Sequence, residues 1–321
     1  MLVLGSASAM ESAEERAIRL PFRLGELTLF SASLRLRVCD RHFLGLGTDP
    51  RATLESLGPL PDRLDGTLLR SHPVEGPQRR RRREGEHLVY VAQEYERSFA
   101  DLTGTMDDYL ARFSGKSRST LRRKVRKFGE LCGGEPVARH FRKPEEMDEF
   151  FRHASAVSEK TYQERLLDMG LPRDDAFRAQ AREAAARDAV RAWLLFHGER
   201  PVAYLYCPVV EDGVVLYAYL GYDPEYASHS PGTVLQMLAF ETLFREEGLR
   251  IFDFTEGEGQ HKSFFATGSV RCADLYVLRP TLRNRSLLRL HGWTDAISGF
   301  AGRALDRIGL KRRIGRWLRR R

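Results

Sequence analysis

Residues 201–265 read PVAYLYCPVVEDGVVLYAYLGYDPEYASHSPGTVLQMLAFETLFREEGLRIFDFTEGEGQHKSFF, and this stretch decides the fold. Alternating apolar residues bounded by turns predict strands at 201–209 and 214–220. A helical pattern follows at 234–247, and an apolar run predicts a strand at 250–254. Hairpin strands followed by a helix and a further strand indicate an α+β fold with a mixed, mostly antiparallel sheet.

The flanking sequence predicts further elements of both kinds. We expect helices at 105–113, 116–132, 145–158 and 176–191, and strands within 25–46 and at 88–93, 192–196 and 273–278. Residues 1–20 are small and polar with little periodicity, and we expect them to be irregular and mobile. No internal repeat is visible.

The positive charge of the chain is concentrated in three segments. The 321 residues contain 52 Lys+Arg and 44 Asp+Glu, a formal net charge of +8. Five consecutive arginines occupy 79–83, residues 116–127 carry seven basic residues and no acid, and residues 281–321 have a net charge of +10. The rest therefore carries −14, so the basicity does not indicate nucleic-acid affinity over the whole surface. We expect the run at 79–83 to be a solvated loop.

Composition excludes several classes of protein. The hydrophobic content of 42% is too high for a disordered chain. The cysteines are too few and too widely spaced for a disulfide scaffold or a zinc site, so we expect no metal; they are Cys39, Cys132, Cys207 and Cys272. No apolar run is long enough to span a membrane, and no signal peptide is visible, which predicts a cytoplasmic protein.

The tetrapeptide Ser230-Pro231-Gly232-Thr233 opens the helix at 234–247. Unsatisfied N–H groups and the positive end of the helix dipole suit a phosphate there. Pro231 fits the first turn because it has no N–H, and Gly232 could let a ligand approach the backbone. Helices commonly begin in this way, so the tetrapeptide indicates a phosphate site only together with the sequence around it.

That context is a glycine-rich loop after the last strand of the stretch. Asp253 lies between two phenylalanines, so we expect its carboxylate to be half-buried and to need a partner, for which Lys262 or a nearby hydroxyl is the obvious candidate. Catalysis is one interpretation of Asp253. The other is an aspartate that braces the loop that follows it.

The same stretch resembles the C-terminal acyltransferase domain of the CelD-type group within the GNAT superfamily, which is related to the FemAB transferases. The matching motifs are G-x-x-P-V-A from Gly198, Y-x-x-x-S-P-G-x-x-L from Tyr226 and F-D-F-x-x-G-x-x-x-x-K from Phe252. The segment YLARFSGKSRSTLRRKVRKF at 109–128 is similar to the basic helix that precedes this domain. Together these motifs cover roughly residues 105–280.

The resemblance implies a GNAT fold in which the strands at 214–220 and 250–254 splay apart. An acyl thioester of coenzyme A or of a carrier protein would lie in that wedge, with its phosphate at the turn 228–234. The usual GNAT loop, Q/R-x-x-G-x-G/A, is reduced here to Gly232. This departure leaves a longer acyl chain, a carrier-protein thioester or an aminoacyl-tRNA donor open.

Acyl transfer needs an oriented amine, a base and a proton donor for the thiolate. The candidate bases are Asp253, Glu256, His261 and His229, and the candidate proton donors are Tyr219 and Tyr217. Each of these residues also has an ordinary structural interpretation. We expect the donor to contact Ser230, Pro231, Gly232, Thr233 and Lys262. Residues 162–165 lie where the resembled family has an acceptor-side helix and loop, which implies that Tyr162, Gln163 and Arg165 line the acceptor pocket. The alternative is an ordinary helix end.

The C-terminal segment has an apolar helical stripe beside basic residues. The stripe comprises Ile297, Phe300, Ala301, Ala304, Leu305 and Ile308, and Trp317 extends it. A basic amphipathic helix with a tryptophan suits an anionic membrane surface, and the alternative is a helix docked on the domain. This predicts a peripheral protein on the inner face of the membrane, with a lipid amine or a membrane-linked saccharide precursor as acceptor.

The sequence therefore predicts four segments: residues 1–20; a degenerate GNAT-like half at 21–145; a GNAT acyltransferase domain at 146–280; and a basic tail at 281–321. The leading hypothesis is an N-acyltransferase that uses acyl-CoA or an acyl-carrier thioester in lipid or cell-envelope biosynthesis. One alternative is a FemAB-like transferase that uses aminoacyl-tRNA. The other is a non-catalytic protein on a GNAT scaffold that binds membrane or nucleic acid.

Overall fold

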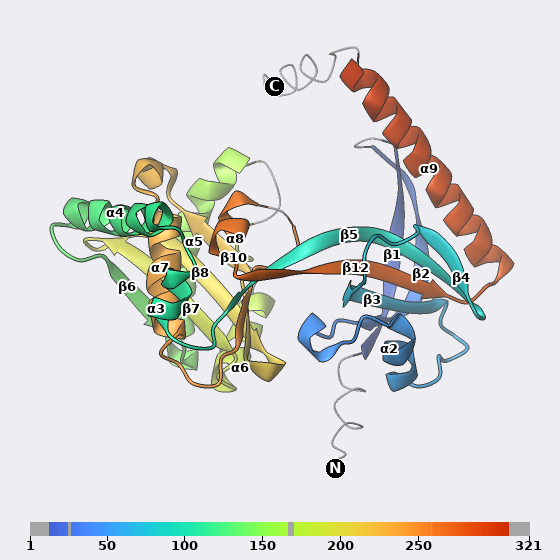
Figure 1. The fold of residues 1–321 in the computed structure, drawn as a ribbon, viewed down its shortest axis with the longest axis horizontal. Helices are drawn as coiled ribbons and strands as arrows, with labels where there is room; N and C mark the ends of the chain where they lie inside the picture. Colours follow the sequence, from blue (N-terminus) through green and yellow to red (C-terminus); the bar gives the residue numbers. More distant parts are fainter. Residues whose placement is uncertain (1–12, 25–26, 166–169, 258, 308–321) are drawn as a thin grey trace. The chain divides into compact units, whose positions relative to one another are not determined.

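The computed structural model describes residues 13–24, 27–165, 170–257 and 259–307 (Figure 1). The chain divides into two compact units. The first comprises the residues up to Tyr95 and from Arg271 on, and the second is Glu96–Val270. Strands β5 (His87–Asp101) and β12 (Gly268–Leu278) contribute residues to both units.

The first unit begins with a long antiparallel hairpin of β1 (Ala13–Leu24) and β2 (Leu27–Cys39). The prediction of an irregular segment is therefore wrong for residues 13–20. Leu20 and Phe22 are buried, and β2 supplies a backbone partner along the whole of β1. Hydrogen bonds to β2 order this polar sequence, and such pairing cannot be predicted from hydrophobic periodicity alone.

The remaining elements of the first unit surround this hairpin. Strand β3 (Gly66–Pro73) pairs in parallel with β2 and antiparallel with β12. A short helix, α2 (Pro50–Ser56), follows the 3₁₀ turn η1 (Phe43–Gly45), and the helix α9 (Leu282–Arg307) packs against β1. The predicted tail thus begins as a helix. Its stripe from Ile297 onward lies outside the described side chains, and residues 308–321 lie outside the described chain.

Three of the five arginines belong to a strand, which corrects the expectation of a loop for residues 81–83. Strand β4 (Arg81–Glu84) pairs antiparallel with β5. The backbone amides find partners on β5, while the long arginine side chains reach carbonyls, a carboxylate and a phenol nearby. Four of the five arginines are exposed, so the run is solvated as expected, while pairing with β5 orders its backbone.

The second unit contains a mixed, mostly antiparallel sheet, as predicted. Its strands follow the order β5-β11-β9-β8-β7-β6, with β10 also paired to β8. The strands not yet introduced are β6 (Val137–Phe141), β7 (Val190–His197), β8 (Arg200–Val210), β9 (Val214–Leu216), β10 (Tyr219–Tyr222) and β11 (Ile251–Asp253). Only the β9–β11 pair among these is parallel.

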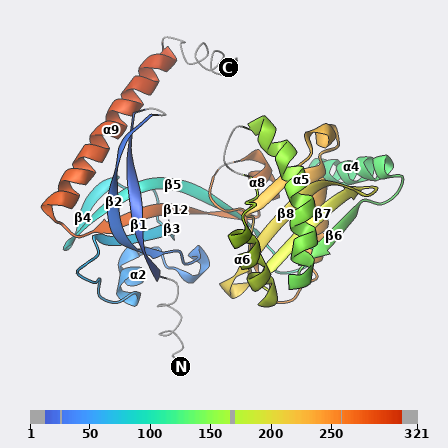
Figure 2. The same cartoon turned by 180° about the vertical axis from the view of Figure 1, so that it is seen from behind.

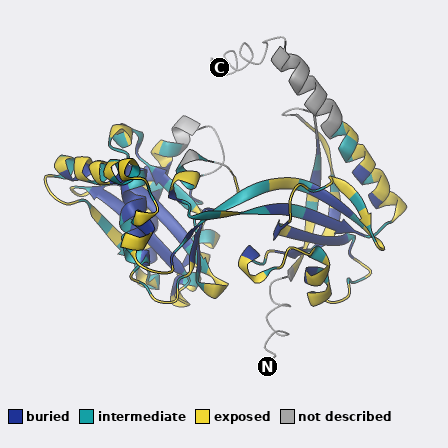
Figure 3. Ribbon diagram, in the orientation of Figure 1, coloured by how far each residue is buried: buried dark blue, intermediate teal, exposed yellow. Residues whose placement is uncertain are grey.

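Helices cover both faces of this sheet (Figures 1 and 2). One face packs against α3 (Met106–Ala111), α4 (Gly115–Cys132) and α7 (Pro231–Leu243). The opposite face packs against α5 (Met147–Arg165) and α6 (Asp175–Ala186). Alternation along the strands feeds both cores: Trp193 faces the first, and Leu194 faces the second. Figure 3 shows the resulting buried central strands between partly exposed helices.

Most predicted helices are confirmed, with shifted ends. Thr105 caps α3 in a reciprocal capping box with Asp108, and α4 coincides with the predicted helix at 116–132. The helix predicted at 176–191 is too long. It ends at Ala186, Asp188 has a positive φ of 59°, and β7 begins at Val190. No helix in the described part of the chain is long and apolar enough to cross a membrane.

Candidate active site

The predicted strand at 214–220 is divided in two, and the division opens a wedge in the sheet. Strand β9 pairs with β11 only as far as Leu216 and Asp253. Beyond that point β10 pairs with β8, while the amide of Phe254 donates to the carbonyl of Ser98 on β5 at 3.0 Å. Strand β10 and the segment after β11 therefore pair with different neighbouring strands. No ladder hydrogen bond joins β10 to β11 among the described residues.

Helix α7 begins next to this wedge, after the 3₁₀ turn η4 (Pro224–His229). Ser230 is the N-cap residue in the left-handed conformation (φ 53°), and its side chain makes no capping hydrogen bond. Pro231 occupies the first turn, as predicted. The helix N-terminus thus keeps backbone donors and its positive dipole end for an anion.

Gly232 serves packing rather than an open approach to the backbone. A Cβ at Gly232 would lie 3.3 Å from Leu220 Cδ2 and 3.6 Å from Tyr222 Cδ1, so this position faces β10. Gly232 is buried, and Thr233 is half-buried. The donors available to a ligand are therefore the amides of this turn and the Thr233 hydroxyl.

Two lysines of the basic helix α4 reach this turn, which the sequence analysis missed. Lys124 Nζ donates to Thr233 Oγ1 at 3.3 Å, and Lys127 Nζ donates to the carbonyl of Ser228 at 3.1 Å. Burial, with help from neighbouring Arg123, lowers the pKa of Lys124. Lys124 borders the apolar stripe of α4, beside Leu121 and Phe128. In the sequence, the position of Lys124 next to the apolar stripe of this helix could have indicated that its side chain reaches α7.

Asp253 is fully buried and is paired with a residue far away in the sequence. Arg97 binds its Oδ2 through Nε at 2.8 Å and through Nη2 at 2.6 Å. The Asp253 Oδ1 atom accepts from the amide of Thr255 at 2.7 Å, and Thr255 has a positive φ of 60°. The expected partner Lys262 instead donates to the carbonyl of Glu256 at 2.6 Å. This geometry matches the bracing interpretation, and no local pattern could have indicated Arg97.

Helix α8 (Gln260–Phe265) brings His261 and Lys262 to the same side as α7. The His261 ring lies 4.9 Å from Phe265 and 6.3 Å from Tyr217 between ring centroids. Its Nε2 is buried and has no hydrogen-bond partner among the described residues. Burial, then the charges of Lys124 and Lys262, lower the pKa of His261, and burial also lowers the pKa of Lys262. His261 is therefore a neutral imidazole at neutral pH.

The two candidate tyrosines lie on opposite faces of the sheet at the wedge. Tyr217 packs against Phe252 and Phe254 in the core beneath α7. Tyr219 packs against Phe177 and Tyr206 in the core beneath α5 and α6. Burial raises the pKa of Tyr219, so its phenol remains protonated and can donate a proton.

Gln236 is a further residue that the sequence analysis did not select. Its side chain is fully buried on α7, and neither its Oε1 nor its Nε2 has a partner among the described residues. An unpaired amide in a core is costly unless something else bonds to it. The sequence could have indicated Gln236, because it is a polar residue within the otherwise apolar face of the helix predicted at 234–247.

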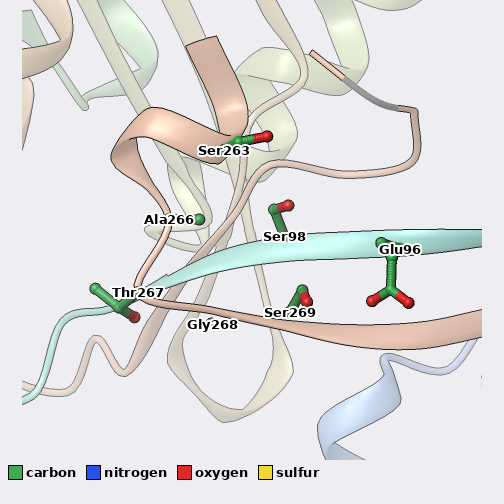
Figure 4. Close-up of a pocket in the computed structure, with 7 residues that line it drawn as sticks. All are labelled: Glu96, Ser98, Ser263, Ala266, Thr267, Gly268 and Ser269. Carbon is green, nitrogen blue, oxygen red and sulfur yellow. The ribbon is translucent and has the colours of Figure 1, made fainter. Parts of the chain in front are cut away.

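The structure does not place every predicted site residue. Tyr162, Gln163 and Arg165 fall at the end of α5, and their side chains lie outside the described residues. Glu256 is exposed, and His229 Nδ1 lies 3.1 Å from Ser228 Oγ. A separate polar cleft of about 490 Å³ lies near α8 and the start of β12 (Figure 4). No predicted site residue lines it; its lining is Glu96, Ser98, Ser263, Ala266, Thr267, Gly268 and Ser269.

Residues 115–263 match the family of acetyltransferase (GNAT) domains. Within these residues the chain is similar to a GNAT acetyltransferase domain, which supports an acyltransferase, and the structure has the α+β fold predicted from the sequence. The domain match favours an enzyme over the non-catalytic alternative. GNAT transferases use a thioester donor and an amine acceptor. No match was found among the curated proteins.

Two solved structures are similar to this chain over most of its length. One is the C-terminal domain (DUF2156) of a putative lysylphosphatidylglycerol synthetase from Agrobacterium fabrum, with 9% identity and a TM-score of 0.50 over 88% of this chain and 89% of that chain. At that identity the similarity shows a common fold alone. The other is FemX, with 11% identity and a TM-score of 0.49 over 89% of this chain and 92% of that chain.

Proposed function

We propose that the protein is an N-acyltransferase that moves an acyl group from a coenzyme A or carrier-protein thioester to an amine acceptor. The single observation that supports this most strongly is the wedge between β10 and β11 beside the uncapped N-terminus of α7. A thioester arm would lie in the wedge, with its phosphate at Thr233 and Lys124. The motifs quoted above support a CelD-type member of the GNAT superfamily.

The chemistry needs two proton transfers on a positioned thioester. The amine attacks the thioester carbonyl, and the carbon–sulfur bond breaks as the new carbon–nitrogen bond forms. His261 accepts the amine proton, because its pKa is lowered and its Nε2 has no partner among the described residues. Tyr219 donates a proton to the leaving thiolate. The Arg97–Asp253 pair positions the loop after β11, and Lys262 contributes positive charge on the donor side.

A direct test of this function measures thiol release from acetyl-CoA, palmitoyl-CoA and an acylated carrier protein with a panel of amines. We expect amine-dependent thiol release and an acylated amine detectable by mass spectrometry. His261→Asn should lower kcat by about 10²–10⁴-fold. His153→Asn, on α5 and away from the wedge, is the matched control and should retain wild-type turnover.

The outcome that contradicts the proposal is equally specific. If no thioester is consumed but aminoacyl-tRNA is, the donor is an aminoacyl-tRNA, as in the FemAB-like alternative. A His261→Asn variant with wild-type kcat would remove the base assignment. Glu256 and Asp253 would then be the remaining carboxylates to test.

We also propose that the first unit contacts an anionic membrane surface through α9. Leu282, Leu290 and Trp293 are 82%, 42% and 70% exposed, and their spacing places them on one side of the helix. The other side is buried, with Leu288 in the core and His291 Nδ1 2.7 Å from Tyr90 Oη. An exposed tryptophan and leucines flanked by the exposed Arg285 and Arg289 suit a lipid interface.

Vesicle co-sedimentation tests this contact. The double variant Leu290→Ser/Trp293→Ser should lose most binding to vesicles that contain phosphatidylglycerol, while Val137→Ser, an exposed apolar residue of the second unit, should bind normally. Unchanged binding of the double variant would contradict the proposal. A membrane contact would make a lipid amine or a membrane-linked saccharide precursor a suitable acceptor.

A further inference from the structure

Unmatched polar groups gather along the first turns of α7. Lys124 is half-buried, and no ion pair to a carboxylate is recorded for it among the described residues, where its hydrogen bond goes to the neutral Thr233 Oγ1. Burying an ammonium without a counter-charge is unfavourable. Lys124 therefore lacks a counter-charge among the described residues, and an anion bound at this turn would supply one.

The number of donors at this turn matches one phosphate group. Pro231 has no N–H, the amide of Ser230 donates to Ala227 at 3.1 Å, and the amide of Val234 donates to Ser230 at 3.1 Å. The remaining groups are the amides of Gly232 and Thr233, the Thr233 hydroxyl and the Lys124 ammonium. These groups offer donors to both free oxygens of one phosphodiester.

Gln236 supplies a second, independent indication of a ligand. It lies one helical turn after Gly232 on the same stripe of α7, and Gly232 faces Leu220 and Tyr222. One turn is about 5–6 Å, or roughly two strand residues, so Gln236 lies near the level at which β9 gives way to β10. A fully buried amide with neither atom bonded among the described residues suits an arm that carries amide groups of its own.

The outward side of α4 carries more positive charge than one phosphate requires. Five of its basic residues are exposed: Lys116, Arg122, Arg123, Arg126 and Lys127. The helix has a single acid, Glu130, which pairs with Arg126 at 3.6 Å. From Lys116 to Lys127 the exposed side is about 17 Å long, which is long enough to contact an α-helix of a partner protein. Figure 3 shows exposed residues along this helix.

We propose that α4 docks an acidic carrier protein, whose phosphopantetheine arm passes Lys124 and Gln236 and places the acyl thioester in the wedge. The inference rests on the proposed function and specifies its donor. A carrier-bound arm has one phosphodiester for this turn, followed by amide groups for Gln236. Acidic helices of the carrier complement the exposed arginines of α4 and bring the arm to Thr233.

The test compares two donors with the same acyl group, one on a carrier protein and one on coenzyme A. In the full-length protein, Arg122→Glu/Arg123→Glu should lower the ratio of kcat/KM for the carrier-bound donor over that for acyl-CoA at least tenfold. Arg187→Glu, an exposed arginine of the second unit outside α4, is the matched control and should change the ratio less than twofold. The loss should shrink at high salt.

Gln236→Leu separates ligand binding from packing. It removes an unpaired buried amide, so the protein should unfold at an equal or higher temperature, while KM for both donors rises. If KM is unchanged, Gln236 does not contact the arm.

An unchanged donor ratio in the double α4 variant would overturn carrier docking and leave the acyltransferase intact. A preference of the wild type for acyl-CoA over the carrier-bound donor would do the same. If neither thioester is used and aminoacyl-tRNA binds α4 instead, the proposed function fails together with this inference.

Discussion

Two basic runs look alike in the sequence, and the structure uses them in different ways. The arginine run at 79–83 belongs to the first unit, and the basic helix α4 belongs to the second. In the first run, four of the five arginines bond to groups of the first unit. In α4 most of the cations have no acidic partner among the described residues.

The arginine run is compensated locally. Arg81 Nη1 donates to the carbonyl of Leu288 at 3.2 Å, Arg80 Nη2 to Tyr90 Oη at 3.2 Å, and Arg82 pairs with Glu84. Arg83 Nε donates to the carbonyl of Gly85 at 3.1 Å. These side chains hold β4 and α9 in place within the first unit.

Helix α4 differs in its exposed arginines. Lys124 and Lys127 also bond to neutral oxygens, at the start of α7, but Arg122 and Arg123 are exposed and have no hydrogen bond or ion pair among the described residues. A run of basic residues therefore indicates an acidic binding partner only where the fold leaves the side chains without partners inside the protein. The comparison can be tested by removing one cation of each kind.

The largest expected effect belongs to the most completely compensated cation, Arg97. Arg97→Met should destabilise the protein by about 3–5 kcal/mol, because it leaves the buried carboxylate of Asp253 without its counter-charge. Denaturant unfolding measures the change. Arg97→Met/Asp253→Asn should recover part of the loss. If the double variant is less stable than the single one, the ion pair is not what Arg97 provides.

The uncompensated Lys124 should matter for activity rather than for stability. Lys124→Met should raise KM for the thioester donor about tenfold or more by removing a charge-assisted hydrogen bond, with unfolding little changed. It should also move the acidic limb of the pH–rate profile to higher pH. The reason is that Lys124 helps to lower the pKa of His261, so its loss raises that pKa, and the base becomes protonated at a higher pH. A limb that moves to lower pH would contradict this coupling.

The smallest effect is expected for the arginine run. Arg81→Met should cost about 0.5–1.5 kcal/mol of stability, because it removes one partly solvated hydrogen bond to the carbonyl of Leu288. Its donor KM should equal that of the wild type. A raised KM would show that this run also serves the ligand, and the contrast with α4 would fail.

Several features of the site followed from the sequence because they are local. The turn before α7, with Pro231 in its first turn, is set by backbone chemistry within a few residues. The capping box of α3 and the apolar stripe of α4 are likewise local patterns. Other features depend on distant partners: Arg97 lies 156 positions from Asp253, and Lys124 lies 109 positions from Thr233. No local pattern identifies such pairs.

Periodicity, turns and caps act over a few neighbouring residues, so the sequence indicated the class of fold, most of its elements and the acyltransferase motifs. The tertiary structure was needed to show where β9 ends and β10 begins, which partner holds Asp253, and which cations remain uncompensated. Those outcomes depend on packing and electrostatics between segments that are far apart in the chain. The function proposed here rests on that second group of features, placed within the domain that the first group predicted.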